Sequence, residues 1–120
     1  MSEAQSSRKT DNPTVHDLTA FQQSILVILS EEPEYGLAIK NDLEEYYGNA
    51  INHGRLYPNL DDLVEQGLIT KSERDKRTNE YSLTEEGYNH LLGQLDWTFS
   101  KVVNSNGRAD DINHLLEKAA

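Results

Sequence analysis

Six residues suited to contacting nucleic acid lie close together in the middle of the chain. They are Asn52, His53, Gly54, Arg55, Tyr57 and Asn59. An arginine guanidinium can donate two hydrogen bonds to guanine O6 and N7, or it can grip a phosphate. Asparagine and histidine side chains can donate to bases or phosphates. Gly54 would let the backbone approach a phosphate closely, so the cluster predicts a surface that binds DNA.

Each of these residues also has an ordinary structural interpretation. Gly54 could simply begin a helix without touching a ligand, and Arg55 could be a solvated side chain paired with a nearby acid. His53 could be a partly buried residue at the helix start. Tyr57 could serve only in core packing. These alternatives stay open on the sequence alone.

A second group of positive charges lies further along the chain, between Thr70 and Asn79. There Lys71, Arg74, Lys76 and Arg77 stand against Glu73 and Asp75. In a loop, Arg74, Lys76 and Arg77 could reach a neighbouring minor groove or the DNA backbone, or they could be only solvated charges. Lys40 could likewise clamp a phosphate or form a surface ion pair.

The rest of the chain is strongly acidic. Its formal net charge is -10, its isoelectric point is near 4.7 and its mean hydropathy is -0.73. A dense carboxylate surface suits a very salty cytoplasm, which predicts a halophilic protein with solvent cations at its acidic surface. The alternative is that many small cytosolic proteins are acidic without being halophilic.

Several other kinds of chemistry find no support in the residues. There is no cysteine, and the four histidines are scattered without metal-ligand spacing. Phosphate-binding loops, nucleophile elbows and paired catalytic carboxylates are absent from the sequence, so we expect no enzyme activity, no metal and no cofactor. Residues 1–12 are polar, and the apolar run 25–29 is far shorter than a membrane helix. We therefore expect a soluble cytoplasmic protein.

Apolar periodicity and capping residues predict the elements that position these side chains. Helices are expected from about residue 19 to 32, over 36–47 and over 52–66, then two strands at 68–72 and 80–83, and helices over 84–103 and 109–119. Thr19 with Gln22 forms a capping box, Asn52 and Thr84 are N-caps, and Gly48 ends the second helix. Expected core residues are Leu37, Leu43, Leu60, Leu63, Leu68, Ile69 and Leu83.

Three helices followed by a two-stranded hairpin is the order of elements in a winged helix-turn-helix. Four stretches then strengthen the case: Tyr35-Gly36, Gly54-Arg55-Leu56-Tyr57-Pro58-Asn59-Leu60, Gly67-Leu68-Ile69 and Tyr81-Ser82-Leu83-Thr84-Glu85-Glu86-Gly87. This succession resembles the PadR family of winged-helix transcriptional regulators, and the acidity resembles its haloarchaeal members. The resemblance implies DNA binding, with Tyr57 near the DNA. It covers residues 21–87.

The segment after the wing shows a long apolar stripe, longer than the core of a small winged helix could cover. Its members recur at three- and four-residue intervals: Tyr88, Leu91 or Leu92, Leu95, Phe99 and Val102. A shorter stripe follows, made of Ile112, Leu115 and Leu116. Many members of the resembled family carry a longer C-terminal dimerisation domain, so dimerisation here must be more compact.

These observations predict a mainly α protein with a small β-hairpin (α+β). A flexible N-terminal arm spans 1–16, a winged helix-turn-helix DNA-binding domain spans 17–87, and C-terminal dimerisation helices span 88–120. The expected function is sequence-specific regulation of transcription by a homodimer on double-stranded DNA, with the third helix in the major groove. The alternative is a winged-helix module that binds proteins and never touches DNA, which the net charge of -10 would suit.

Overall fold

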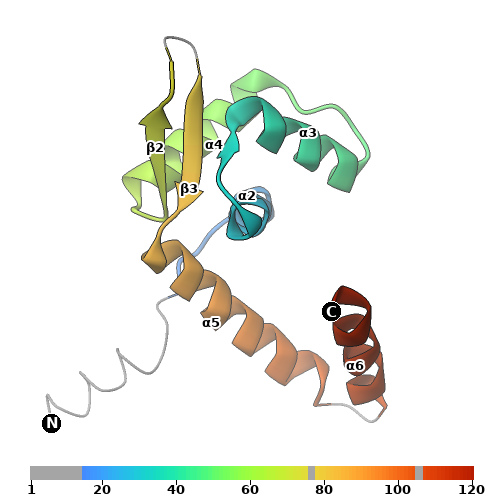
Figure 1. Ribbon diagram of the computed structural model, residues 1–120. Helices are drawn as coiled ribbons and strands as arrows, with labels where there is room; N and C mark the ends of the chain where they lie inside the picture. The colour runs from blue at the N-terminus through green and yellow to red at the C-terminus, as the bar shows by residue number, and fades with distance from the viewer. Residues whose placement is uncertain (1–14, 76–77, 105–106) are drawn as a thin grey trace, which may run out of the picture.

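The computed structural model describes residues 15–75, 78–104 and 107–120, and it shows a winged helix followed by two further helices (Figure 1). The elements are α2 (Ala20–Glu31), β1 (Glu34–Tyr35), α3 (Gly36–Tyr47), α4 (His53–Glu65), β2 (Ile69–Glu73), β3 (Asn79–Leu83), α5 (Glu85–Val102) and α6 (Arg108–Ala119). Among the described helices, none combines the length and the hydrophobicity needed to cross a membrane.

Local capping chemistry sets the helix boundaries, as the sequence predicts. The Thr19 hydroxyl accepts the Gln22 backbone N–H, and the Gln22 side chain accepts the Thr19 N–H, which completes the capping box. Asn52 caps α4 by accepting the Arg55 N–H at 2.7 Å. Gly48 ends α3 with a φ of 76°, a left-handed conformation that glycine adopts without steric cost.

The sheet has three strands rather than the two of the expected hairpin. Its order is β1-β3-β2, and both pairs are antiparallel. The additional strand, β1, pairs Glu34 with Tyr81 and Tyr35 with Glu80. This pairing ties the start of α3 to the wing, and it thereby fixes where the two helices of the helix-turn-helix meet the hairpin.

A single apolar core lies between α2, α3, α4, the sheet and the first half of α5. Its buried members are Phe21, Ile25, Leu26, Leu29, Ile39, Leu43, Ile51, Leu56, Leu60, Leu63, Leu68, Ile69, Tyr81 and Leu91. The expectation of a buried Leu37 is wrong, since that side chain is 59% exposed. Leu37 lies in the first turn of α3, which begins beside the wing, while Leu83 is half-buried and packs against the core.

The helix α5 is anchored to the end of the winged helix by its N-cap. The Thr84 hydroxyl donates to the Gly67 carbonyl and accepts the Gly87 N–H, while the Thr84 N–H donates to the Leu68 carbonyl. A side chain at Gly87 would collide with that Leu68 carbonyl, so the close approach requires glycine. From this anchor α5 runs away from the sheet, and α6 follows it at the far end with no buried residue (Figure 1).

Candidate nucleic-acid interface

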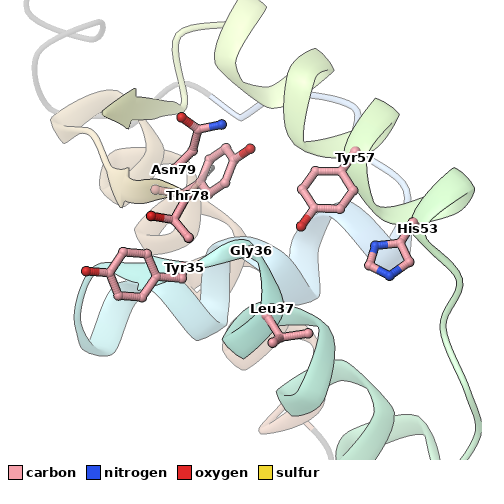
Figure 2. A pocket seen from close by; sticks show the side chains of 8 residues that line it. Tyr35, Gly36, Leu37, His53, Tyr57, Thr78 and Asn79 are labelled. Atoms are coloured by element: carbon pink, nitrogen blue, oxygen red, sulfur yellow. The ribbon is translucent and has the colours of Figure 1, made fainter. Parts of the chain in front are cut away.

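A pocket of about 350 Å³ opens where the starts of α3 and α4 face the wing. Figure 2 shows its walls, with Tyr35, Gly36 and Leu37 from one side, His53 and Tyr57 from α4, and Thr78 and Asn79 from the hairpin. Tyr81 forms the buried back of the pocket. Of these described lining residues none is acidic, although the chain carries a net charge of -10. No carboxylate among these lining residues would therefore repel an anion bound in the pocket.

The pocket owes its shape to the contact between Tyr57 and Gly36. A methyl group at position 36 would lie 2.7 Å from the Tyr57 Oη and 3.0 Å from its Cε1, which is too close for non-bonded atoms. Glycine thus lets the tyrosine ring rest against the start of α3, with its hydroxyl directed toward that helix end (Figure 2). The His53 ring stacks on the Tyr57 ring with centroids 5.7 Å apart, which holds the tyrosine from its other side.

The start of α3 is an open helix N-terminus. Its N-cap residue is Tyr35, whose side chain makes no capping hydrogen bond. The first backbone N–H groups of a helix have no partner within the helix, and the helix dipole makes that end favourable for anions. This helix end lines the pocket together with Tyr57, His53 and Asn79, whose side chains carry hydrogen-bond donors suited to a phosphate group.

The first turn of α4 uses several of its polar side chains for its own structure. Asn52 Oδ1 serves as the cap, and Asn59 Nδ2 donates to the Arg55 carbonyl at 2.8 Å. Gly54 is exposed, and a Cβ there would meet only the Asn52 Oδ1, at an ordinary contact distance of 3.4 Å. Since packing within the protein does not demand glycine at position 54, the space above it is open to an approaching ligand.

Arg55 lies on the other side of α4 from Tyr57. Its guanidinium carbon stands 4.0 Å from the centroid of the Phe21 ring, which in turn stacks on Tyr47. An exposed cation over an aromatic face gains about 0.5–1 kcal/mol. The arginine is therefore held toward α2 in the free protein, and it would give up this contact if it turned fully into a groove.

Lys40 forms an ion pair within α3. Its Nζ lies 2.9 Å from Glu44 Oε2, and the same carboxylate accepts the Ile51 backbone N–H. The hydrogen bond from Ile51, and then the one from Lys40, hold the pKa of Glu44 below its usual range. The lysine thus helps to fix the turn between α3 and α4, and its interpretation as a surface ion pair fits this geometry.

The described cations of the wing are also paired. Arg74 donates through Nε and Nη2 to a single carboxylate oxygen of Glu80, with Nη2 at 2.6 Å. Lys71 Nζ lies 3.8 Å from Asp61 on α4. Lys76 and Arg77, the other two wing residues expected at the interface, lie outside the described residues.

The structure does not bring all the expected interface residues together. It brings His53 and Tyr57 into the pocket, while Arg55 and Asn59 lie on the side of α4 that faces α2, and Lys40 is tied to Glu44. Sequence reasoning missed the other six pocket residues as site candidates: Tyr35, Gly36, Leu37, Thr78, Asn79 and Tyr81. The Tyr35-Gly36 pair was the available signal, because it opens a helix next to a cluster of hydrogen-bond donors.

The residues expected to form a dimer are mostly exposed in the protomer. The exposed fractions of Tyr88, Leu92, Leu95 and Phe99 range from 38% to 52%, and Leu115 and Leu116 exceed half. Val102 and Ile112 are half-buried. Leu91 differs, since it is 6% exposed and packs in the core, so the structure takes it out of the exposed stripe and leaves Leu92 there.

Comparison with known proteins shows which family and which solved structures this chain resembles. The model of the transcriptional regulator PadR-like family matches residues 25–92. The chain is 57% identical to RosR of Halobacterium salinarum. In a structure described as the complex hsRosR-S4, the match covers 87% of this chain and 90% of that one, with a TM-score of 0.82. In the structure of RosR grown from NaBr, the shares are 87% and 94%, with a TM-score of 0.83.

More distant structures share the fold alone. A PadR family transcription regulator from Clostridium difficile is 24% identical, over 71% of this chain and 94% of that one, with a TM-score of 0.59. No curated protein matches the chain. Among the described residues, no group of three or more histidine, aspartate or glutamate side chains is placed to hold a metal ion.

Proposed function

The chain belongs to the PadR-like family of transcriptional regulators, and we propose that it controls transcription by binding a specific DNA site as a homodimer. Membership of this family implies DNA as a partner and a regulatory rather than an enzymatic role. In the proposed complex, α4 enters the major groove, and the wing contacts the flanking backbone or minor groove. A two-fold symmetric dimer requires a roughly palindromic site, with half-sites about one helical turn or a multiple apart. A regulator of this kind would act in the cytoplasm, where its DNA is.

The observation that carries this proposal is the pocket at the start of α3. The uncapped end of that helix, the Tyr57 hydroxyl, His53 and Asn79 converge on one non-acidic concavity. A DNA phosphate seated there would fix the register of α4 in the neighbouring groove, since phosphate contacts position a protein on the duplex. We assign Tyr57 to this backbone contact and not to base recognition.

Tyr57→Phe tests the assignment, because it removes the hydroxyl and keeps the ring that packs against Gly36. We expect affinity to fall by about fivefold, which corresponds to about 1 kcal/mol for one lost hydrogen bond. The fall should be similar on the specific site and on random DNA, since a phosphate contact carries no sequence information. Fluorescence anisotropy with labelled duplexes from the protein's own promoter region, and with scrambled duplexes, measures both.

Two results would contradict the proposal for Tyr57. Unchanged affinity on both duplexes would leave the tyrosine as a packing residue only. A loss confined to the specific duplex would make it a base contact. The wild-type protein could also bind the promoter duplex and the scrambled duplex equally well across a range of salt. That result would refute specific binding to its own promoter region.

We assign Arg55 to base recognition at the exposed start of α4. Arg55→Ala is expected to weaken binding to the specific site by about 1–3 kcal/mol, because an arginine that reads guanine supplies about that much discrimination. Binding to random DNA should change much less. The same anisotropy titrations measure the difference between the two duplexes.

Arg108→Ala provides the matched control for Arg55. It removes the same charge from an exposed position at the start of α6, far along the chain from the pocket, and should leave both affinities unchanged. An equal loss on specific and random DNA in Arg55→Ala would demote Arg55 to a phosphate contact. A small drop in stability is expected in any case, since the stacking on Phe21 is lost.

The remaining expected residues complete the proposed contact surface. Asn52, Gly54 and Asn59 line the first turns of α4, where amide groups and the open backbone at Gly54 can approach bases or phosphates. We propose that Arg74, Lys76 and Arg77 contact the flanking backbone or minor groove. In this view Lys40 approaches the DNA only as part of its pair with Glu44.

The homodimer is proposed from the unpartnered apolar faces of the C-terminal helices. Tyr88, Leu92, Leu95 and Phe99 line one face of α5, and no residue of α6 is buried in the protomer. The exposed Val27 and Tyr46 continue this surface, because they share a groove with Gln94 of α5. Monomeric proteins rarely leave such contiguous apolar area uncovered. A second copy, related by two-fold symmetry, would cover it.

A further inference from the structure

His90 is buried at a junction of three segments outside the proposed DNA surface. It lies on α5 with no exposed area. Its Nδ1 accepts the backbone N–H of His16, at 2.9 Å, and its Nε2 lies 2.7 Å from Gln23 Oε1 on α2. Since Nδ1 accepts and the Gln23 oxygen can only accept, Nε2 must carry the proton. The contacts therefore fix His90 as a neutral imidazole in one tautomer.

Protonation of His90 is incompatible with this arrangement. A second proton would sit on Nδ1 and face the His16 N–H, which would set two donors against each other. Burial lowers the pKa of His90, and the nearby His16 ring lowers it further. The His16 ring stands 5.8 Å from the His90 ring, with its Nε2 3.0 Å from Glu86 Oε2, while α2 presents the neutral amide of Gln23.

We propose that His90 is a pH-sensitive clasp, which ties the segment before α2 to α5 when neutral and releases it on acidification. The clasp connects α2, which belongs to the winged helix, to α5, which leads away from it. It thus adds a polar contact to those that Thr84 and Leu91 already make between α5 and the winged helix. The proposal rests on contacts within one protomer and does not depend on DNA binding.

The direction of the effect follows from proton linkage. In the unfolded chain His90 titrates near the ordinary value of about 6.5, whereas the folded protein resists protonation. Below that pH the unfolded state binds more protons than the folded state, so stability is lost as pH falls. The unfolding equilibrium constant should rise by up to tenfold for each pH unit below about 6.5, until His90 itself titrates in the folded protein.

A nuclear magnetic resonance titration of the wild-type protein, at fixed high KCl and protein concentration, gives the first test. The ring carbon signals of His90 should stay in the neutral form to clearly lower pH than those of a histidine in an unstructured peptide. When His90 does titrate, the His16 amide should lose its protection against hydrogen exchange at the same pH. Titration of His90 at an ordinary pH, or without any change in the His16 amide, overturns the proposal.

Urea unfolding between pH 8 and pH 5, at the same KCl, gives the second test. His90→Gln keeps an acceptor and a donor but cannot titrate, and it should remove most of the acid-dependent loss of stability. His114→Gln should behave as wild type. His16→Gln keeps the backbone N–H that His90 accepts and removes only the smaller cause of the lowered pKa, so it should retain most of the loss that His90 causes. If the free energy of unfolding depends on pH in the same way for wild type and His90→Gln, the clasp is overturned. If His90→Gln does not fold, the magnetic resonance titration of the wild-type protein tests the clasp instead.

Discussion

The double variant Leu95→Asp with Phe99→Asp is expected to be a folded monomer that has lost high-affinity DNA binding. Both side chains are exposed in the protomer, at 45% and 38%, so two carboxylates there leave the core of the winged helix intact. In a dimer they would bury four negative charges without partners, which costs far more than the interface gains. A monomer engages one half-site only. The loss of the linked second half-site should lower affinity by about 100-fold or more.

Sedimentation velocity at molar KCl measures the oligomeric state, and anisotropy with the palindromic duplex measures the binding. Ser100→Asp with Asn104→Asp is a suitable control, since it adds the same two charges at exposed positions outside the stripe. The control should dimerise and bind as wild type does. A wild-type protein that sediments as a monomer under these conditions would refute the dimer, and a dimeric double variant would place the interface elsewhere.

The structure also shows why the stripe on α5 could not be read fully from the sequence. Tyr88 is followed at three and four residues by Leu91 and Leu92, and periodicity alone cannot choose between them. The choice depends on how Gly87 lets α5 approach the Leu68 carbonyl, because that approach turns Leu91 into the core. Leu92 then continues the row through Leu95 and Phe99.

Features set by neighbouring residues were predictable, and features set by distant partners were not. The capping box at Thr19, the cap at Asn52 and the glycine end at Gly48 are local chemistry, and each was predicted. The strand β1 has two residues and exists only because β3 pairs with it, so no periodicity could reveal it. Leu37 was wrongly predicted to be buried for a related reason. Its helix begins at the edge of the pocket, and no local pattern shows where that edge lies.

The same distinction applies to the candidate interface. The candidate residues were visible as residue types, but the contacts of the charged ones depend on how the elements pack. Arg55 rests on Phe21, and Arg74 and Lys71 pair with carboxylates on other elements. The contact of Tyr57 with Gly36 also joins two helices. Sequence indicates which side chains could bind DNA, whereas the fold decides which of them are already engaged.

The ion pairs of these cations also affect how the affinity for DNA depends on salt, which is the second large effect that we expect. An ordinary DNA-binding protein that contacts six to ten phosphates loses about 10³–10⁵ in affinity between 50 mM and 200 mM salt, because its cations release counterions from the DNA. Here Lys40, Arg74 and Lys71 are paired with the carboxylates of Glu44, Glu80 and Asp61, while Arg55 lies over the Phe21 ring. The chain as a whole carries a charge of -10, so we expect its cations to displace few counterions from DNA.

We therefore expect the affinity for DNA to change little, or even to rise, as KCl increases from dilute to molar concentration. At 1 M salt the Debye length is about 3 Å, so the acidic surface no longer repels the DNA. Binding then depends on short-range contacts such as that of Tyr57, and we propose that solvent cations between carboxylates and phosphates add to it. Anisotropy across the KCl series measures the affinity, and circular dichroism in parallel separates lost binding from unfolding at low salt.

Glu80→Gln sharpens this prediction, because it frees the Arg74 guanidinium without changing the shape of the wing. An unpaired arginine that reaches a phosphate should make the dependence of log affinity on log salt steeper by about 0.9 per protomer. Glu117→Gln removes the same charge from α6, and it should leave the slope as in wild type. If the wild-type protein already shows the steep fall of six or more released counterions, its cations are not neutralised by these carboxylates when DNA binds. The ion pairs at the wing would then open on binding, and the flat salt dependence would be refuted.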